Sequence, residues 1–397
     1  MKKVLAVCSN SLHRKTFLEL VAQSKLLNYN VEIILIDLEK TVDTKLNFGL
    51  LPLKKLKYQS RYISYLINTL KYVYFNANYK IQNILNSLKP DFVLLGNDTG
   101  HFERSIIRVA KRNKITTLLL QDGLLFSQIR SNKRTKIGKK IFFLYQKYIS
   151  RFIGSVKYGF GGCDIFLSIG KYWSDIIHDY GDSLHKQLYT VSSPYYESFI
   201  KPNIQSSNIN EYVSNKSFCI TYFLTNFLTG LNDKMAHELQ LCEIKNLYQK
   251  AYFVFKEHFN LILKIHPEDI CINYISLAQL GLQIEITKSA SLDYIFSKSD
   301  LCITNFSSVF IQAYFNHKIC LLSNIGLRHT KYSDFILSLN LPTLNSIEDF
   351  ENLLLDIKMN KDLTFDKAHF DKQMKGFIDF DPDKSSSERV LELLNTL

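Results

Sequence analysis

Residues 300–315 read Asp-Leu-Cys-Ile-Thr-Asn-Phe-Ser-Ser-Val-Phe-Ile-Gln-Ala-Tyr-Phe. The apolar and β-branched residues 301–304 predict a short buried strand, and residues 309–315 predict the helix that follows it. The same alternation of short strand and helix recurs on both sides of this stretch. Such alternation is typical of parallel sheets covered by helices on both faces, so we expect an α/β fold.

The alternation can be followed through most of the chain. Upstream, strands are predicted at residues 4–8, 31–36, 92–95, 116–120, 164–168 and 188–191, and helices at 16–27, 102–112 and 171–180, with two more helical stretches within 51–88. Downstream, strands are predicted at residues 218–224, 261–265, 284–287, 301–304 and 319–322, and helices at 235–259, 274–280, 292–298 and 309–315.

The chain is long enough for two domains, since it has 397 residues and a typical domain has ~150. A polar stretch at residues 202–214 interrupts the alternation. We therefore expect two Rossmann-like domains facing a cleft, at residues 1–192 and 215–397. Ser385 and Glu388 have the spacing of a capping box, which predicts a final helix within the second domain.

Composition narrows the class of protein. Hydrophobic residues make up 46% and charged residues 22%, which is typical of a soluble globular chain. The 49 Lys and Arg residues exceed the 37 Asp and Glu residues, and the net charge of +12 favours an anionic partner such as nucleic acid, lipid head groups, a nucleotide sugar or an acidic polysaccharide. No run of about 18 apolar residues occurs, and the apolar start at residues 4–8 is too short for a signal peptide.

The seven cysteines are scattered and form no CxxC pair. We read them as reduced core residues of a cytosolic protein, and we expect no metal site.

Ligands of open parallel sheets bind at the carboxyl ends of the strands, so the residues after the predicted strands are the candidates. Asp122 follows the strand at 116–120 and could act as a general base, although Asp122-Gly123 is also a common turn dipeptide. His266 follows the strand at 261–265. It could donate a proton or a hydrogen bond to a phosphate leaving group, or it could simply end the strand.

Two further loops carry hydroxyl and amide groups. Ser307 and Ser308 precede a predicted helix, where they could bind an anion or serve as a plain N-cap. Asn97 and Asp98 follow the strand at 92–95 and could bind an acceptor or a phosphate, or could merely cap the next helix. One domain thus offers a carboxylate, and the other offers a histidine and a phosphate cradle. Transfer from a nucleotide-activated donor needs that set.

In this order and spacing, the motifs Gln121-Asp122-Gly123, His266-Pro267 and Ser307-Ser308 resemble those of bacterial GT-B sialyltransferases and polysialyltransferases. Those enzymes carry an acidic-acidic-Gly motif, a His-Pro motif and a Ser-Ser or Ser-Thr motif, and Gln121 departs from the first. Capsule enzymes that use CMP-Kdo, and glycerophosphotransferases that use CDP-glycerol, are similar more loosely.

The resemblance implies a metal-independent glycosyltransferase without a cofactor, in which Asp122 is the base and His266 assists the departing phosphate. Pro267, Asn305, Ser307 and Ser308 would contact the nucleotide sugar. Asn97, Asp98 and Gly123 would lie on the acceptor side. The donor would be a CMP-activated acidic sugar, used to build a capsular or lipooligosaccharide polysaccharide.

A basic stretch follows Asp122 directly. Residues 124–163 contain no Asp or Glu, and they include Arg130, Lys133 and Arg134. A solvated helix face is the plainer interpretation. The stretch could instead bind an anionic oligosaccharide or glycolipid acceptor, or dock on an anionic membrane at about 1 kcal/mol per basic residue. We accordingly expect a cytoplasmic protein, with a peripheral position at the inner face of the cell membrane as one option.

Other interpretations stay open. A CDP-polyol phosphotransferase or a UDP-sugar glycosyltransferase of the same fold would use the same loops, and a non-catalytic protein that binds anionic glycans could share them. A nucleic-acid partner is not expected, because no nucleic-acid motif accompanies the aromatic residues. The chain has no P-loop motif, and the DxD spacing at residues 379–383 precedes the capping box, so we assign it to a loop.

Overall fold

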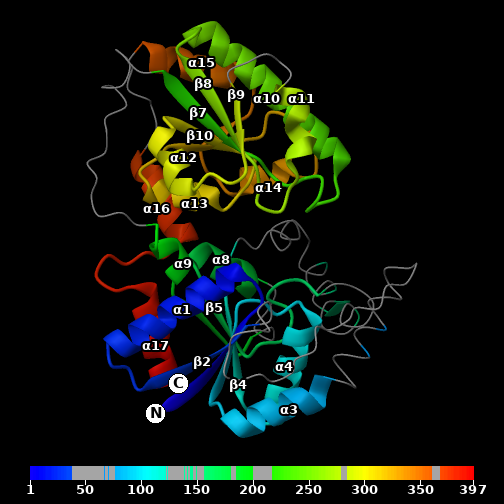
Figure 1. Ribbon diagram of the computed structural model, residues 1–397, viewed down its shortest axis with the longest axis vertical. Coiled ribbons are helices and arrows are strands. Elements are labelled where there is room, and N and C mark those ends of the chain that lie inside the picture. Colours follow the sequence, from blue (N-terminus) through cyan, green and yellow to red (C-terminus); the bar gives the residue numbers. More distant parts are fainter. Residues whose placement is uncertain are drawn as a thin grey trace. The chain divides into compact units, whose positions relative to one another are not determined.

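The structure, a computed structural model, describes residues 1–37, 77–121, 123, 156–179, 185–199, 217–278, 284–359 and 367–397, with isolated positions between these ranges (Figure 1). The chain forms two compact units. Unit 1 consists of Met1–Ser198 together with Lys375–Leu397, and unit 2 consists of Phe199–Met374. Each unit contains one parallel sheet, so the predicted α/β fold with two Rossmann-like domains is confirmed.

Unit 1 has a six-stranded sheet in the order β2-β1-β3-β4-β5-β6, with every neighbouring pair parallel. Its strands are β1 (Lys2–Cys8), β2 (Val31–Asp37), β3 (Phe92–Leu95), β4 (Thr116–Leu120), β5 (Ile165–Ser168) and β6 (Gln187–Thr190). Its helices are α1 (Ser11–Leu26), α3 (Ala77–Leu88), α4 (His101–Arg112), α8 (Lys171–His178), α9 (Pro194–Glu197) and α17 (Ser386–Thr396). The order of the strands turns back between β1 and β3, which creates a switch point there.

Unit 2 has a six-stranded parallel sheet in the order β12-β11-β10-β7-β8-β9. Its strands are β7 (Phe218–Phe223), β8 (Phe259–Lys264), β9 (Ile284–Thr287), β10 (Leu301–Thr304), β11 (Cys320–Ser323) and β12 (Thr343–Leu344). Its helices are α10 (Lys234–Phe255), η4 (Cys271–Tyr274), α11 (Ile275–Ala278), α12 (Leu292–Lys298), α13 (Val309–Phe315), α14 (Ser333–Ser338) and α15 (Ile347–Lys358). Counted along the unit, this is the 3-2-1-4-5-6 order of a dinucleotide-binding fold, and its switch point lies between β7 and β10.

Helix α16 (Lys367–Phe377) leads from unit 2 back to unit 1, where α17 completes the first core. The predicted capping box is present, with the Ser385 hydroxyl accepting from Glu388 N and the Glu388 carboxylate accepting from Ser385 N. The apolar face of α17 is buried with α1 and β2, through Val390, Leu391 and Leu394. The expected second domain of residues 215–397 was therefore wrong at its end, because this apolar stripe packs into the core of unit 1.

The seven cysteines are all free. Five of them are buried, as expected, but Cys242 and Cys271 are exposed. No helix among the described residues combines the length and the apolar character that crossing a membrane requires.

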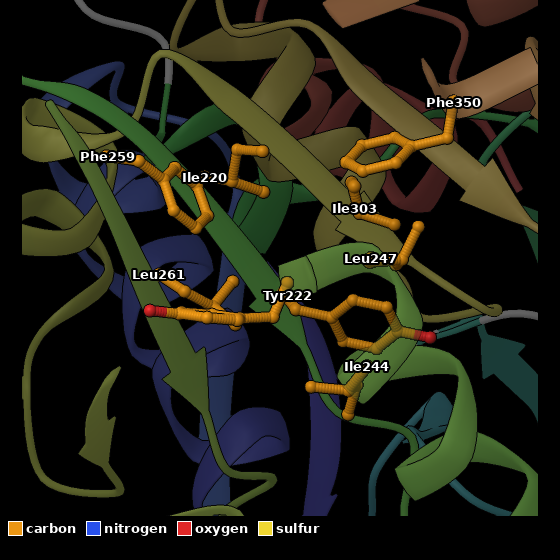
Figure 2. Close-up of a pocket in the computed structure, with 9 residues that line it drawn as sticks. Ile220, Tyr222, Ile244, Leu247, Phe259, Leu261, Ile303 and Phe350 are labelled. Carbon is orange, nitrogen blue, oxygen red and sulfur yellow. The ribbon is translucent and has the colours of Figure 1, made fainter. Parts of the chain in front are cut away.

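A small apolar cavity lies inside the core of unit 2, between the sheet and helices α10 and α15. Figure 2 shows Ile220, Tyr222 and Phe350 among its lining side chains. Interiors normally pack without voids, so truncating a lining residue enlarges an existing cavity and removes apolar contacts.

Phe350→Ala should destabilise unit 2 by about 3–5 kcal/mol, because Phe350 is fully buried and its loss widens this cavity. Urea unfolding would measure the change. Leu355→Ala on the same helix is the matched control, since Leu355 is 40% exposed. If the two variants lost equal stability, the prediction that Phe350 contributes to the core of unit 2 would be wrong.

Candidate active site

Asn305 immediately follows β10 at the switch point of unit 2, and its side chain is fully buried. Asn305 Nδ2 donates to the Ser323 carbonyl oxygen at the end of β11 over 3.0 Å. The Tyr222 hydroxyl lies 2.9 Å from Asn305 Oδ1 and 2.7 Å from Glu243 Oε1. Asn305 therefore connects β7, β10, β11 and α10, and it has no exposed atom with which to contact a nucleotide sugar. The expectation of direct contact is corrected to a positioning role.

Burial favours the neutral form of Glu243 in this network. Desolvation raises the pKa of Glu243, which is fully buried. A hydroxyl has one proton to donate, so Tyr222 can donate to only one of its two neighbours. A protonated Glu243 would supply the missing donor, because its carboxyl would donate to the Tyr222 oxygen while the Tyr222 hydroxyl donates to Asn305 Oδ1. All three side chains would then be satisfied.

Aromatic packing fixes the same loop from another direction. The Phe306 ring stacks on Tyr332 at a centroid distance of 5.4 Å, and it meets the edge of Phe227 at 5.5 Å. These rings hold the chain immediately before Ser307 and Ser308, which are half-buried. Asn305 and Phe306 thus leave the two serines at the surface of the carboxyl edge of the sheet.

The two serines do not act as a conventional cap. Ser308 is the N-cap of α13, yet its side chain makes no capping hydrogen bond, and Ser307 Oγ accepts only a long bond of 3.4 Å from Val309 N. Within the described part of the chain, the Ser308 hydroxyl has no hydrogen-bond partner. Both hydroxyls can therefore donate to an oxygen anion.

His266 follows β8 on the same edge, and its side chain is partly buried. The Glu268 N–H donates to His266 Nδ1 at 3.2 Å, so a neutral imidazole carries its proton on Nε2. Burial lowers the pKa of His266 below its ordinary value, and the carboxylates of Glu268 and Asp269 only partly oppose that shift. His266 is thus poised as a neutral N–H donor through Nε2. Pro267, the next residue, is exposed.

Asp269 holds this loop in place. Its carboxylate is fully buried and accepts from the Tyr274 hydroxyl at 2.6 Å, from Asn273 Nδ2 at 2.9 Å and from Ile270 N at 2.8 Å. The Thr229 hydroxyl, in the loop after β7, lies 3.3 Å from both the Glu268 carbonyl oxygen and Asp269 Oδ1. The loops after β7 and β8 are therefore tied together.

The structure brings His266 and the serine pair to one edge of unit 2. β7 lies between β8 and β10, so the two loops start two strand spacings apart, roughly 10 Å. The loop after β7 lies between them and contains Thr225, whose buried Oγ1 has no hydrogen-bond partner among the described residues. Sequence reasoning missed Thr225, Tyr222 and Glu243, because no motif marks them.

In unit 1, Asp122 and the basic residues Arg130, Lys133 and Arg134 lie outside the described residues. Gln121 is fully buried: its Nε2 donates to the Gly123 carbonyl oxygen at 2.6 Å, and its Oε1 accepts from Ile169 N at 3.2 Å. An ionised carboxylate could not make the first bond, which accounts for an amide at the position where the sialyltransferase motif has an acid. Gly123 is half-buried.

Asp98 is also fully buried, and both carboxylate oxygens are occupied. Gly159 N donates to Oδ1 at 2.9 Å, and Gly161 N donates to Oδ2 at 2.6 Å. A Cβ atom on Gly161 would lie 2.0 Å from the Asp98 carbonyl oxygen, so this close approach requires glycine. Asp98 therefore braces the glycine-rich loop 159–162, and the expected acceptor contact is corrected. Asn97 is half-buried, and its Oδ1 accepts from Thr99 N and Thr99 Oγ1.

Among the residues that the structure describes, no group of three or more His, Cys, Asp or Glu side chains could hold a metal ion.

The carboxyl of Asp98 should make unit 1 less stable as the pH rises. Burial raises its pKa from 3.8 to about 7, so between these values the folded state holds a proton that the unfolded state releases. The stability of the wild type relative to Asp98→Asn should therefore fall between pH 4 and pH 7, by about 1.4 kcal/mol for each unit of pKa shift.

Urea unfolding at several pH values would measure this dependence. Asp175→Asn, at an exposed carboxylate of α8, is the control and should run parallel to the wild type. If Asp98→Asn also runs parallel, the carboxylate is ionised throughout this range and the assignment fails.

No protein-family model matches the sequence, and no curated protein matches it either. Solved structures match its fold. A Listeria monocytogenes protein, provisionally assigned as a UDP-N-acetylglucosamine 2-epimerase, has a TM-score of 0.59 at 14% identity, and the match covers 100% of this chain and 96% of that chain.

Two more structures show the range of the similarity. The UDP-GlcNAc 2-epimerase from Neisseria meningitidis, bound to UDP-GlcNAc, has a TM-score of 0.57 at 12% identity, with 100% of both chains covered. The glycotransferase of kitacinnamycin has a TM-score of 0.54 at 10% identity, with 99% of this chain and 98% of that chain covered. At such identities the similarity shows the fold alone, which is the GT-B type with two Rossmann-like domains. It does not support the sialyltransferase family in particular.

Proposed function

We propose that this chain is a glycosyltransferase that uses a nucleotide-activated sugar, with a UDP-sugar favoured over the CMP-sugar expected from the motifs. The observation that carries the proposal is the convergence of His266 with Ser307 and Ser308 on the carboxyl edge of unit 2, around its switch point. The preference for a UDP-sugar rests on structural neighbours that bind UDP-GlcNAc, and none of the comparisons supports CMP-sialic acid.

The geometry suggests how the donor would be held. The Ser307 and Ser308 hydroxyls would donate to phosphate oxygens, and His266 would donate through its Nε2 proton. As the bond between sugar and phosphate breaks, negative charge grows on the phosphate, and these donors would stabilise it more strongly than in the bound substrate. A growing anion beside the imidazole would raise its pKa, so His266 could also deliver a proton.

The acceptor side depends on residues outside the described ranges. We keep Asp122 in the proposal as the base that deprotonates an acceptor hydroxyl. We also keep the acceptor contacts of Gly123, Arg130, Lys133 and Arg134. The acid-free stretch 124–163 also contains exposed apolar side chains, namely Ile141, Leu144, Tyr145 and Ile149. Basic and apolar residues together would suit a glycolipid acceptor or a peripheral contact with an anionic membrane.

Donor screening separates the competing functions. Release of nucleotide from UDP-sugars would support the proposal. Release only from CMP-sialic acid or CMP-Kdo would instead support the CMP-sugar glycosyltransferase expected from the motifs. Release only from CDP-glycerol would indicate a phosphotransferase. Formation of a 2-epimer without transfer would indicate the reaction named for the structural neighbours. A chain that binds anionic glycans and turns over none of these donors would be a binding protein.

Ser307→Ala combined with Ser308→Ala should weaken nucleotide binding by about 100-fold or more, because two hydrogen bonds to a charged group, each worth about 1.5–3 kcal/mol, are lost. His266→Ala should lower both affinity and turnover. Calorimetry with UDP, followed by assays of turnover, would measure these effects. Ser297→Ala is the control, since Ser297 bonds only within α12. Unchanged affinity in both site variants would place the donor elsewhere.

Asp122→Asn should reduce transfer by about 10²–10⁴-fold and leave nucleotide affinity within about twofold, because a general base acts on the acceptor. Steady-state transfer rates and calorimetry together would measure this split. A variant that retains more than about a tenth of the wild-type rate would make Asp122 a turn residue.

A further inference from the structure

The loop after β11 is anchored at both of its ends to the loop after β10. At its start, the Ser323 carbonyl oxygen accepts from Asn305 Nδ2 at 3.0 Å. At its end, the Tyr332 ring stacks on Phe306. Both ends of the segment 324–331 are therefore fixed to Asn305 and Phe306, which immediately precede the serine pair.

A third anchor lies within this loop. Gly326 N donates to Glu243 Oε2 at 2.8 Å, and a Cβ atom on Gly326 would lie 2.8 Å from the same oxygen and 2.9 Å from the Leu239 carbonyl oxygen. Only glycine allows this close approach to α10. The loop thus leaves β11 along a defined path. Leu327, the residue after Gly326, is buried, and the two residues that follow it, Arg328 and His329, are exposed.

Arg328 is distinctive in both sequence and structure. It is the only arginine between residues 152 and 388, so every other permanently charged cation of unit 2 is a lysine. Within the described part of the chain, neither Arg328 nor His329 makes a hydrogen bond or an ion pair. Lys331, by contrast, is paired with Asp233 at 2.5 Å. Arg328 therefore carries an exposed guanidinium without a partner among the described residues, on a loop whose two ends are anchored to the loop that carries the serine pair.

Unpartnered polar atoms occur at the base of the same edge. Thr225 Oγ1, after β7, and Asn324 Oδ1, after β11, are both buried and have no hydrogen-bond partner in the part of the chain that the structure describes. Buried polar groups are nearly always paired in folded proteins, so such atoms call for an explanation. A polar ligand or ordered water at this edge would supply the missing partners.

We propose that Arg328 and His329 bind the second phosphate of a nucleoside diphosphate, which makes the donor class a nucleoside diphosphate sugar. This inference rests on the proposed function. The serine pair follows β10 and the cationic pair follows β11, and neighbouring strands lie about 4.8 Å apart. Two adjacent phosphates match two adjacent sets of donors. Arginine suits this task because its planar guanidinium pairs with phosphate through two parallel hydrogen bonds.

The test compares nucleoside mono- and diphosphates by calorimetry on the full chain, with UMP and UDP and with CMP and CDP as probes. The wild type should bind the diphosphate of one base at least about tenfold more tightly than its monophosphate. Arg328→Ala should remove most of this preference and leave monophosphate affinity within about twofold. Arg328→Lys should be intermediate, since it keeps the charge and loses the fork. His329→Ala should reduce the preference less.

Lys245→Ala is the charge-matched control, because it removes one positive charge from the middle of α10, and it should change neither affinity by more than about twofold. The inference is overturned if Arg328→Ala leaves the preference for diphosphate intact, or if it weakens both nucleotides equally; the proposed function survives either result. If the wild type binds none of the four nucleotides, the proposed function and this inference both fail.

Discussion

The buried amide of Asn305 is the contact on which the candidate site depends. It joins the strand that precedes the serine pair to two neighbouring strands and to α10, in a region from which water is excluded. An unpaired polar group there would cost about 1–3 kcal/mol, so the amide, the Tyr222 hydroxyl and the Glu243 carboxyl have to be satisfied together. If one of these three groups moved, the other two would have to move with it. This network therefore fixes the position of the segment that follows Asn305, which contains Ser307 and Ser308.

The alternation of apolar runs was sufficient to predict the two sheets and all of their described strands except the two-residue β12. The rule that ligands bind after parallel strands also selected His266, Ser307 and Ser308, which lie on one edge of unit 2. The same rule failed for Asn305 and Asp98. Both residues follow strands, but whether such a side chain faces solvent or the interior depends on partners far away in the chain. The partners of Asp98 are the backbone groups of Gly159 and Gly161, which no local pattern could indicate.

The end of the chain shows a related limit. The Ser385–Glu388 capping box is local, so it predicted the start of α17 correctly. Val390, Leu391 and Leu394 place that helix in the core of unit 1, because they pack against an apolar surface there. The sequence of an amphipathic helix does not indicate which sheet the helix covers.

Gln121 illustrates the opposite case. Gln121 departs from the acidic motif, and its two hydrogen bonds give that departure a structural cause.

The division of unit 1 into two chain segments has a consequence for folding during synthesis. Unit 2 is continuous, so it can fold once residue 374 has left the ribosome. The first 198 residues emerge earlier, but they lack α17 and expose the apolar surface on α1 and β2 that this helix later covers. This apolar surface stays uncovered until α17 has been synthesised. Most of unit 1 is therefore synthesised before unit 2, but unit 1 is completed only after unit 2, when α17 joins it.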